Sequence, residues 1–252
     1  MTPRSNAVAA VLVACAVLDA FPAAAVDGEI LIDQAKVNSG GVTPGDTAGF
    51  PATLSRPGRY KLSGNLAVPP NINGINITAN DVSIDLNGFT ILSATAGSGI
   101  GISAPTESNR IRIANGSITG FSYGFLNLGI GDIVEDMRIV GNSTGIRIET
   151  GRIRNSTITN NSAHGILCHG CLIEQNIIAG NGSVGIYDDT AGGGLVLGNI
   201  IAGNGNYGLI SPDPPLPKTG YGNNILIGNN GSALQGLGIA QLHPNVCEPA
   251  CP

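Results

Sequence analysis

The amino-acid sequence predicts an all-β protein, a single-stranded parallel β-helix in which the chain coils into a solenoid. The main observation is a repeat: short segments rich in Ile and Val recur through residues 142–231, and each is followed three residues later by an asparagine. A fixed period near 20 residues with strand-like segments is typical of solenoids. The recurring asparagines, 19, 20, 23 and 26 residues apart, are Asn142, Asn161, Asn181, Asn204 and Asn230.

Two further observations support this fold class. The repeated segments are too short for helices, and their Ile and Val residues favour strands. One repeat alone cannot bury its inward side chains, whereas a second coil stacked about 4.8 Å away can do so. The recurrent asparagine then falls at the same corner of every coil, and we expect its amide to hydrogen-bond to the equivalent asparagine above and below.

The repeat also carries a family resemblance. Residues 156–161 read S-T-I-T-N-N and lead to Gly165-Ile166, with Asn176 and Asn199 at the first Asn position of the next two coils. This resembles the N-x-I-x-x-N-x-x-x-G-I repeat of the right-handed parallel β-helix superfamily, which includes pectate lyases and other carbohydrate-active proteins. The resemblance covers about residues 58–230. It implies a right-handed coil, but its motif consists of core and corner residues and so says little about activity.

The first 25 residues predict a secretory signal peptide. Arg4 precedes an apolar run at residues 7–18, and small residues end at Ala25, the expected cleavage site. The apolar run is too short to span a membrane, and no other stretch is long enough. We therefore expect a secreted or periplasmic protein. An alternative is a lipoprotein, because Leu12-Val13-Ala14-Cys15 matches a bacterial lipoprotein box that would leave Cys15 lipidated.

The rest of the chain forms one domain with three parts. Residues 26–58 lack the period and predict an N-terminal cap, because a solenoid must cover its terminal apolar faces and strand edges. Within them, residues 30–37 could form a strand or a short helix. The parallel β-helix is expected over residues 59–231, and residues 232–252 are expected to fold over the last coil. The opening also resembles that of exported bacterial β-helix proteins of undefined function.

One row of polar residues is the candidate binding site. Glu149, His169 and Asp189 are each 20 residues apart and should stack on the outside of consecutive coils, with Tyr187 alongside. Such a row could bind a metal, or it could supply acid and base groups to a saccharide. The alternative is a solvated face whose charges alternate by chance. A second row, Glu135, Arg154 and Glu174, is expected to form structural ion pairs between coils.

Four cysteines follow the predicted signal peptide: Cys168, Cys171, Cys247 and Cys251. An even number in an exported chain indicates disulfides, and a Cys247–Cys251 bond would staple the non-repeating tail. Cys168 and Cys171 could form a second local bond or remain as buried thiols. A zinc site that combines them with nearby histidines is a further alternative. No cofactor is indicated.

The sequence leaves the function between two classes. With 12% charged residues, a net charge of −5 and no basic cluster, it lacks the features of a nucleic-acid-binding protein. The active-site motifs of the resembling lyases, polygalacturonases and epimerases are absent. For example, His164-Gly165 lacks the preceding glycine and the partner acids of the polygalacturonase motif. We therefore expect a carbohydrate-interacting or structural protein with a polysaccharide as its partner. The alternative is a polysaccharide lyase or glycoside hydrolase with an unfamiliar site. The oligomeric state is not indicated.

Overall fold

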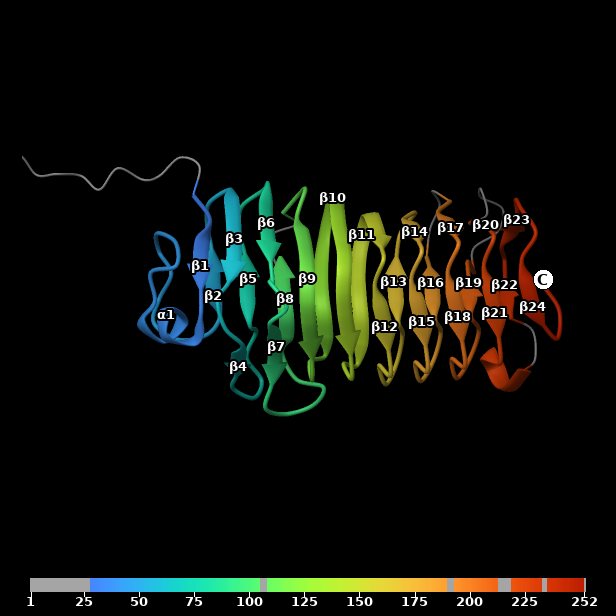
Figure 1. Ribbon diagram of the computed structural model, residues 1–252, viewed down its shortest axis with the longest axis horizontal. Coiled ribbons are helices and arrows are strands. Elements are labelled where there is room, and N and C mark those ends of the chain that lie inside the picture. Colours follow the sequence, from blue (N-terminus) through green and yellow to red (C-terminus); the bar gives the residue numbers. More distant parts are fainter. Residues whose placement is uncertain (1–27, 105–107, 190–192, 213–218, 233–234, 252) are drawn as a thin grey trace, which may run out of the picture.

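The computed structural model describes residues 28–104, 108–189, 193–212, 219–232 and 235–251. The predicted signal peptide and Cys15 lie outside the described residues. Within them the chain winds as a parallel solenoid, with strands stacked side by side along one long axis (Figure 1). Each strand pairs in parallel with the strand one coil later, as the repeat predicts.

The strands form three faces, which each coil crosses in turn. The first face contains β2 (Ala52–Leu54), β5 (Ile75–Ile77), β8 (Ile100–Ala104), β13 (Ile166–Cys168), β16 (Ile186–Asp188), β19 (Leu209–Ile210) and β22 (Gly236–Leu237). The second contains β1 (Ile30–Ile32), β3 (Gly58–Leu62), β6 (Val82–Asp85), β14 (Leu172–Glu174), β17 (Leu195–Leu197), β20 (Gly220–Gly222) and β23 (Ala240–Gln241). The third contains β4 (Leu66–Val68), β7 (Thr90–Ser93), β12 (Thr157–Thr159), β15 (Ile177–Ala179), β18 (Ile200–Ala202), β21 (Ile225–Ile227) and β24 (Val246–Glu248).

Three longer strands continue around the corners between faces. They are β9 (Arg112–Thr119), β10 (Tyr123–Val140) and β11 (Thr144–Arg154). From β12 to β21, the middle residue of each three-residue strand on the second and third faces is buried. On the second face, Ile153 of the longer strand β11 stacks in register with Ile173 and Val196, and all three are buried. Burial of such side chains at every coil stabilises the solenoid, since each one contributes about 1.5–3 kcal/mol relative to an exposed position.

An asparagine ladder follows the third face. The side-chain amide of Asn142 donates to Oδ1 of Asn161 at 3.2 Å, and the same bond links Asn161 to Asn181 and Asn181 to Asn204 at 2.9 Å. The prediction of Asn230 as the next member is wrong: Asn204 donates to Asn229 at 2.8 Å. The short 3-10 helix η1 (Asn229–Ser232) places the ladder residue one position earlier in the turn.

A second ladder was missed by the sequence interpretation and lies at the corner between the second and third faces. Asn176 donates to Asn199 at 3.0 Å, and Asn199 to Asn224 and Asn224 to Asn245 at 3.1 Å. Ser156 occupies the first position of this ladder, and its hydroxyl accepts the backbone N–H of Met137 at 3.1 Å. Ser156, Asn176, Asn199 and Asn224 are buried, and the hydrogen bonds of this ladder offset the cost of desolvating them.

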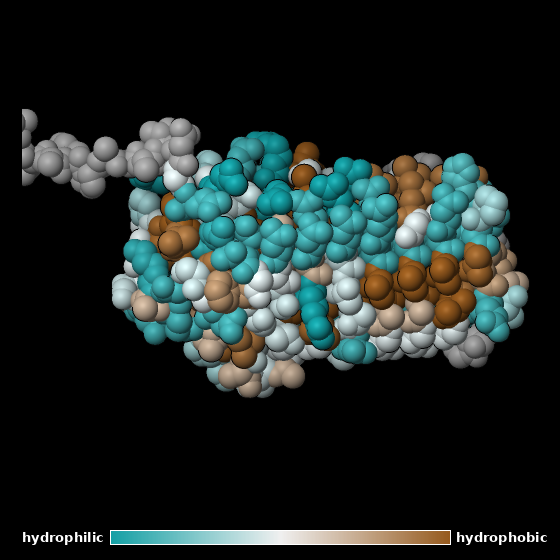
Figure 2. All heavy atoms as spheres, viewed as in Figure 1, coloured by the Kyte–Doolittle hydropathy of each residue, from teal (hydrophilic) through white to brown (hydrophobic). Residues whose placement is uncertain are grey.

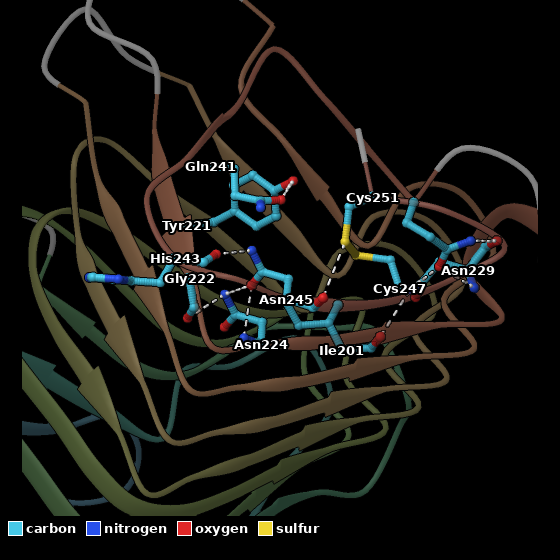
Figure 3. Close-up of a disulfide and its surroundings, with 11 residues drawn as sticks. Ile201, Tyr221, Gly222, Asn224, Asn229, Gln241, His243, Asn245, Cys247 and Cys251 are labelled. Carbon is cyan, nitrogen blue, oxygen red and sulfur yellow. Dashed lines mark hydrogen bonds between the residues drawn. A yellow bond between two sulfur atoms is a disulfide. The ribbon is translucent and has the colours of Figure 1, made fainter.

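Both ends of the chain take part in the stack more than expected. In residues 26–58, β1 pairs with β3 and β2 pairs with β5, and helix α1 (Gln34–Ser39) lies between these two strands in the sequence. In residues 232–252, β22, β23 and β24 continue the three faces. Cys247 and Cys251 form the expected disulfide, with 5.0 Å between their Cα atoms, and it lies beside Asn245 (Figure 3).

No helix in the described part of the chain is long and apolar enough to cross a membrane.

Candidate functional site

The predicted outward row is brought together at the turns that follow the first face. Nδ1 of His169 lies 2.7 Å from Oε2 of Glu149, and Nε2 lies 3.4 Å from Oδ2 of Asp189. The backbone supports this alignment, because the N–H of His169 donates to the carbonyl of Glu149 at 2.8 Å. The side chains are 26%, 30% and 43% exposed for His169, Glu149 and Asp189, so the row is open to solvent. We call these three residues the acid–histidine row.

The contacts within the acid–histidine row limit its chemistry. Both ring nitrogens of His169 face carboxylates, so neither is directed at a substrate as a general base requires. Glu149 and Asp189 are two coils apart, about 9–10 Å along the stack. That spacing is at the upper limit for an inverting glycosidase, but such an enzyme needs a water and a sugar between its acids. His169 occupies that space instead, and the row is better described as an ion-pair ladder.

Tyr187 lies on the first face rather than against the acid–histidine row. It is in register with Leu167 and Ile210 on the neighbouring strands. Its ring meets the edge of the His164 ring, with 5.7 Å between centroids and an interplanar angle of 61°. Burial lowers the pKa of His164, and Nδ1 of this ring is buried with no hydrogen-bond partner in the described structure. Tyr187 therefore packs with a largely neutral histidine.

Cys168 and Cys171 are buried free thiols, which settles the open question of their pairing. Contact with Cys171 together with burial raises the pKa of the Cys168 thiol well above its ordinary value. The Cys168 thiol is therefore expected to be protonated and unreactive. Among the described residues, no group of three or more His, Cys, Asp and Glu side chains is arranged to hold a metal ion.

Asp188 is a buried carboxylate that the sequence interpretation did not identify. It occupies the inward column of Ile148 and Cys168, whereas its neighbour Asp189 points outward. Its carboxylate accepts the backbone N–H groups of Gly170 at 2.8 Å and Gly194 at 3.0 Å, and also the Thr219 hydroxyl. These bonds give the group a structural role at a corner of the stack. The strict register with Cys168 was the observation that could have revealed it.

The second predicted row is present as a charge ladder on the second face. Glu135 is 5% exposed and lies between Arg112 and Arg154, whose Nε atoms each donate to it at 2.7 Å. Burial alone would raise the pKa of Glu135, but the bonds and charges of Arg154 and Arg112 outweigh this effect and leave it below its ordinary value. Glu174 continues the row in register with Arg154.

A groove with a volume of about 530 Å³ lies at the corner between the second and third faces, and the sequence interpretation missed it. One side is the turn column Asn115, Asp136 and Asn155, all exposed and all with positive φ. The other side is the outward column of the third face, in register from coil to coil. We call this the corner groove. Its lining consists of Gly88, Asn115, Gly116, Ser117, Asp136, Met137, Arg138, Asn155 and Thr157.

Backbone geometry explains part of this lining. The turn into the third face needs a left-handed residue in each coil, which Asn and Gly adopt more readily than other residues do. The same column continues past the groove as Gln175, Gly198 and Asn223, with φ of 57°, 65° and 56°. In the described structure, the side chains of Asn155, Gln175 and Asn223 make no hydrogen bond. Their amides are therefore available to a ligand.

An apolar surface extends the outward column beyond the groove. Thr157 is followed in register by Ile177, Ile200, Ile225 and Val246, one on each successive coil. These four side chains are 45%, 41%, 37% and 63% exposed. They contribute to the brown band on the C-terminal half of the molecule in Figure 2. We call them the aliphatic stripe. The double Ile at residues 177–178 and 200–201 was the signal that could have revealed it, since one of two adjacent strand residues must point outward.

Comparisons with known proteins agree with this architecture. Residues 131–240 match a family model described as a right handed beta helix region. The crystal structure of the Dettilon tailspike protein (gp208) aligns with a TM-score of 0.57 and 16% identity, over 70% of this chain. This chain spans only 42% of that one. The A-module of the mannuronan C-5 epimerase AlgE6 of Azotobacter vinelandii aligns over 84% of this chain and 69% of its own, with 13% identity and a TM-score of 0.43.

A search of curated proteins found no match in sequence. The family model, the coil register and the two ladders therefore lead to one identification. Residues 131–240 match the right-handed β-helix family model, and the chain as a whole has the parallel β-helix fold.

Proposed function

We propose that this protein binds a polysaccharide chain in the corner groove. Sugars present rows of hydroxyl groups that donate and accept at once. A carboxamide can bond to a hydroxyl in either role, because its oxygen accepts hydrogen bonds and its NH₂ donates them. The groove offers Asn115 and Asn155 on one side and the hydroxyls of Ser117 and Thr157 on the other. This combination of a hollow with convergent polar groups is typical of ligand sites.

The observation that supports the proposal best is the state of Arg138. This side chain is exposed in the groove, and in the described part of the chain it forms no ion pair or hydrogen bond. Arg112 and Arg154 are instead held by Glu135. The need for a left-handed corner accounts for the asparagines, but not for an unpaired guanidinium beside them. Its five donors are well suited to sugar hydroxyls.

An active site at the acid–histidine row has less support, because His169 is engaged on both sides. Export of the protein remains part of the proposal, since the predicted signal peptide would bring it to extracellular or periplasmic glycans.

The experiment is a glycan array probed with the protein that lacks residues 1–25. The wild type should bind at least one polysaccharide, and Arg138→Ala should weaken that binding about tenfold or more, because a lost hydrogen bond to a charged group costs about 1.5–3 kcal/mol. Arg147→Ala is the matched control, because Arg147 is an outward arginine on the first face. New reducing ends or unsaturated uronates in the binding mixture would point to catalysis. No bound glycan, or equal effects of the two variants, would refute the proposal.

A further inference from the structure

We infer that the bound polymer continues from the corner groove onto the aliphatic stripe, and that it is an uncharged polysaccharide with methyl-bearing units, such as 6-deoxy or acetylated sugars. This inference rests on the proposed function and specifies the ligand of the same surface. Its basis is the unbroken register between the polar outward column of the corner groove and the apolar residues of the aliphatic stripe.

The groove and the stripe share one line along the axis of the solenoid. Ser117, Arg138 and Thr157 occupy successive coils of the outward column, and Ile177 and Ile200 follow in the same register. Coils are separated by about 4.8 Å, so the four stripe residues extend the line beyond Thr157 by about 19 Å. A ligand that lies along the groove and continues in the same direction must therefore cross the stripe.

The aliphatic stripe has a polar border, which distinguishes it from a surface suited to a purely apolar partner. The turn column passes beside it with Gln175 and Asn223, whose amides make no hydrogen bond in the described structure. A purely apolar partner would leave those amides desolvated and unpaired, which is costly. A sugar chain has hydroxyl edges and apolar patches along its length, so it can satisfy both the amides and the stripe.

The shape of the stripe indicates which apolar patches fit. Flat sugar rings stack best on aromatic rings, but the four stripe residues are Ile and Val. Branched aliphatic side chains, spaced one per coil, offer small separate contacts that suit methyl groups. Each methyl group buried on the stripe is expected to tighten binding about fourfold. Several along one chain would give a clear preference over a polymer that lacks them.

The charges along this surface favour an uncharged polymer. In the groove, Asp136 and Arg138 carry opposite charges. The stripe carries none, and its C-terminal end is bordered by Glu248, which is exposed and in register with Ile227. A polyanion would meet one cation and two carboxylates on this path, so charge gives it no advantage.

The experiment is calorimetry on the protein without residues 1–25, with paired neutral oligosaccharides. One member of each pair carries 6-deoxy or acetylated units and the other carries the matching unmodified hexoses. Each pair is tested at two chain lengths, short chains of two to three units and long chains of eight or more. The variant is Ile200→Ser combined with Ile225→Ser. Both side chains point outward, so the variant should fold, and its thermal melt checks this. Leu195→Ser is the matched control, because Leu195 is 43% exposed on the second face.

The wild type should prefer the long methyl-bearing chain over its long unmodified counterpart by tenfold or more. The Ile200→Ser, Ile225→Ser variant should lose that preference and still bind short chains as the wild type does, whereas Leu195→Ser should behave as the wild type. Equal affinity of the wild type for the long pair, or a preference that survives in the variant, would overturn the inference. So would sedimentation showing a dimer that the variant dissociates, since a second copy would then cover the stripe.

Failure of this inference can be separated from failure of the proposed function. If short chains bind and Arg138→Ala abolishes their binding, the groove is the site even when the stripe has no effect. If no chain of either kind binds the wild type, both proposals are wrong.

Discussion

Replacement of Asn181 by leucine tests the ladder that holds the coils in register. The Asn181 side chain is 1% exposed and makes four bonds across three coils. It donates to Asn204 at 2.9 Å and to the carbonyl of Ile158 at 3.2 Å. Its Oδ1 accepts the backbone N–H of Asn161 at 3.1 Å and the side-chain amide of Asn161 at 2.9 Å. Leucine has a similar volume and can make none of these bonds.

The magnitude follows from the groups left without this partner. The buried N–H of Asn161 and the carbonyl of Ile158 each lose a bond, at about 1–3 kcal/mol per group left unsatisfied. Added apolar burial offsets part of this loss, so we expect Asn181→Leu to lower the free energy of unfolding by about 2–4 kcal/mol. In a chain of this size that corresponds to a fall in Tm of about 5–15 °C.

The assay is thermal melting followed by circular dichroism, with Asn206→Leu as the control. Asn206 is exposed, and its side chain makes no hydrogen bond in the described structure, so its replacement should change Tm by less than about 2 °C. Equal falls in Tm for the two variants would refute the ladder as a source of stability.

Three further predictions test other parts of the structure. Mass spectrometry of the unreduced protein should show a Cys247–Cys251 crosslink, and Cys251→Ser should cost about 2 kcal/mol in the last coil; two alkylatable thiols in the tail would contradict this. Burial raises the pKa of Asp132 to about 6, so the folded state favours the protonated carboxyl. The contribution of this group to the free energy of unfolding is therefore present at low pH and is lost as pH rises through about 6. The wild type should therefore gain about 1 kcal/mol from pH 7 to pH 5 relative to Asp132→Asn, in urea titrations at both pH values; equal changes would exclude the raised pKa. His169→Ala should cost at most about 1 kcal/mol and leave glycan affinity within about twofold; a loss as large as that of Arg138→Ala would move the binding site to the acid–histidine row.

The coil and its first ladder could be predicted from the sequence because each depends on a local pattern that recurs in every coil. Inward Ile residues and corner asparagines such as Asn161 and Asn181 repeat with the period of the chain. The prediction was wrong at Asn230, where a 3-10 turn shifts the ladder to Asn229. A period fixes the spacing of corners but not the length of each turn.

The candidate binding surface could not be predicted in the same way. The 20-residue spacing of the repeats placed Glu149, His169 and Asp189 in one row, but it could not show that the imidazole of His169 contacts both carboxylates. The corner groove depends on where the left-handed turn falls relative to the next strand, which only the backbone geometry shows. The repeat did not distinguish the outward isoleucines from the inward ones beside them, as Ile177 adjoins Ile178.

The most direct test of the central claim is a crystal structure of the protein with the tightest glycan from the array. We predict a sugar chain parallel to the axis of the solenoid, in the corner groove, with hydroxyl groups bonded to Arg138 and to the amide of Asn155. Glycan density over the acid–histidine row or on the first face beside Tyr187, with the corner groove empty, would contradict the claim.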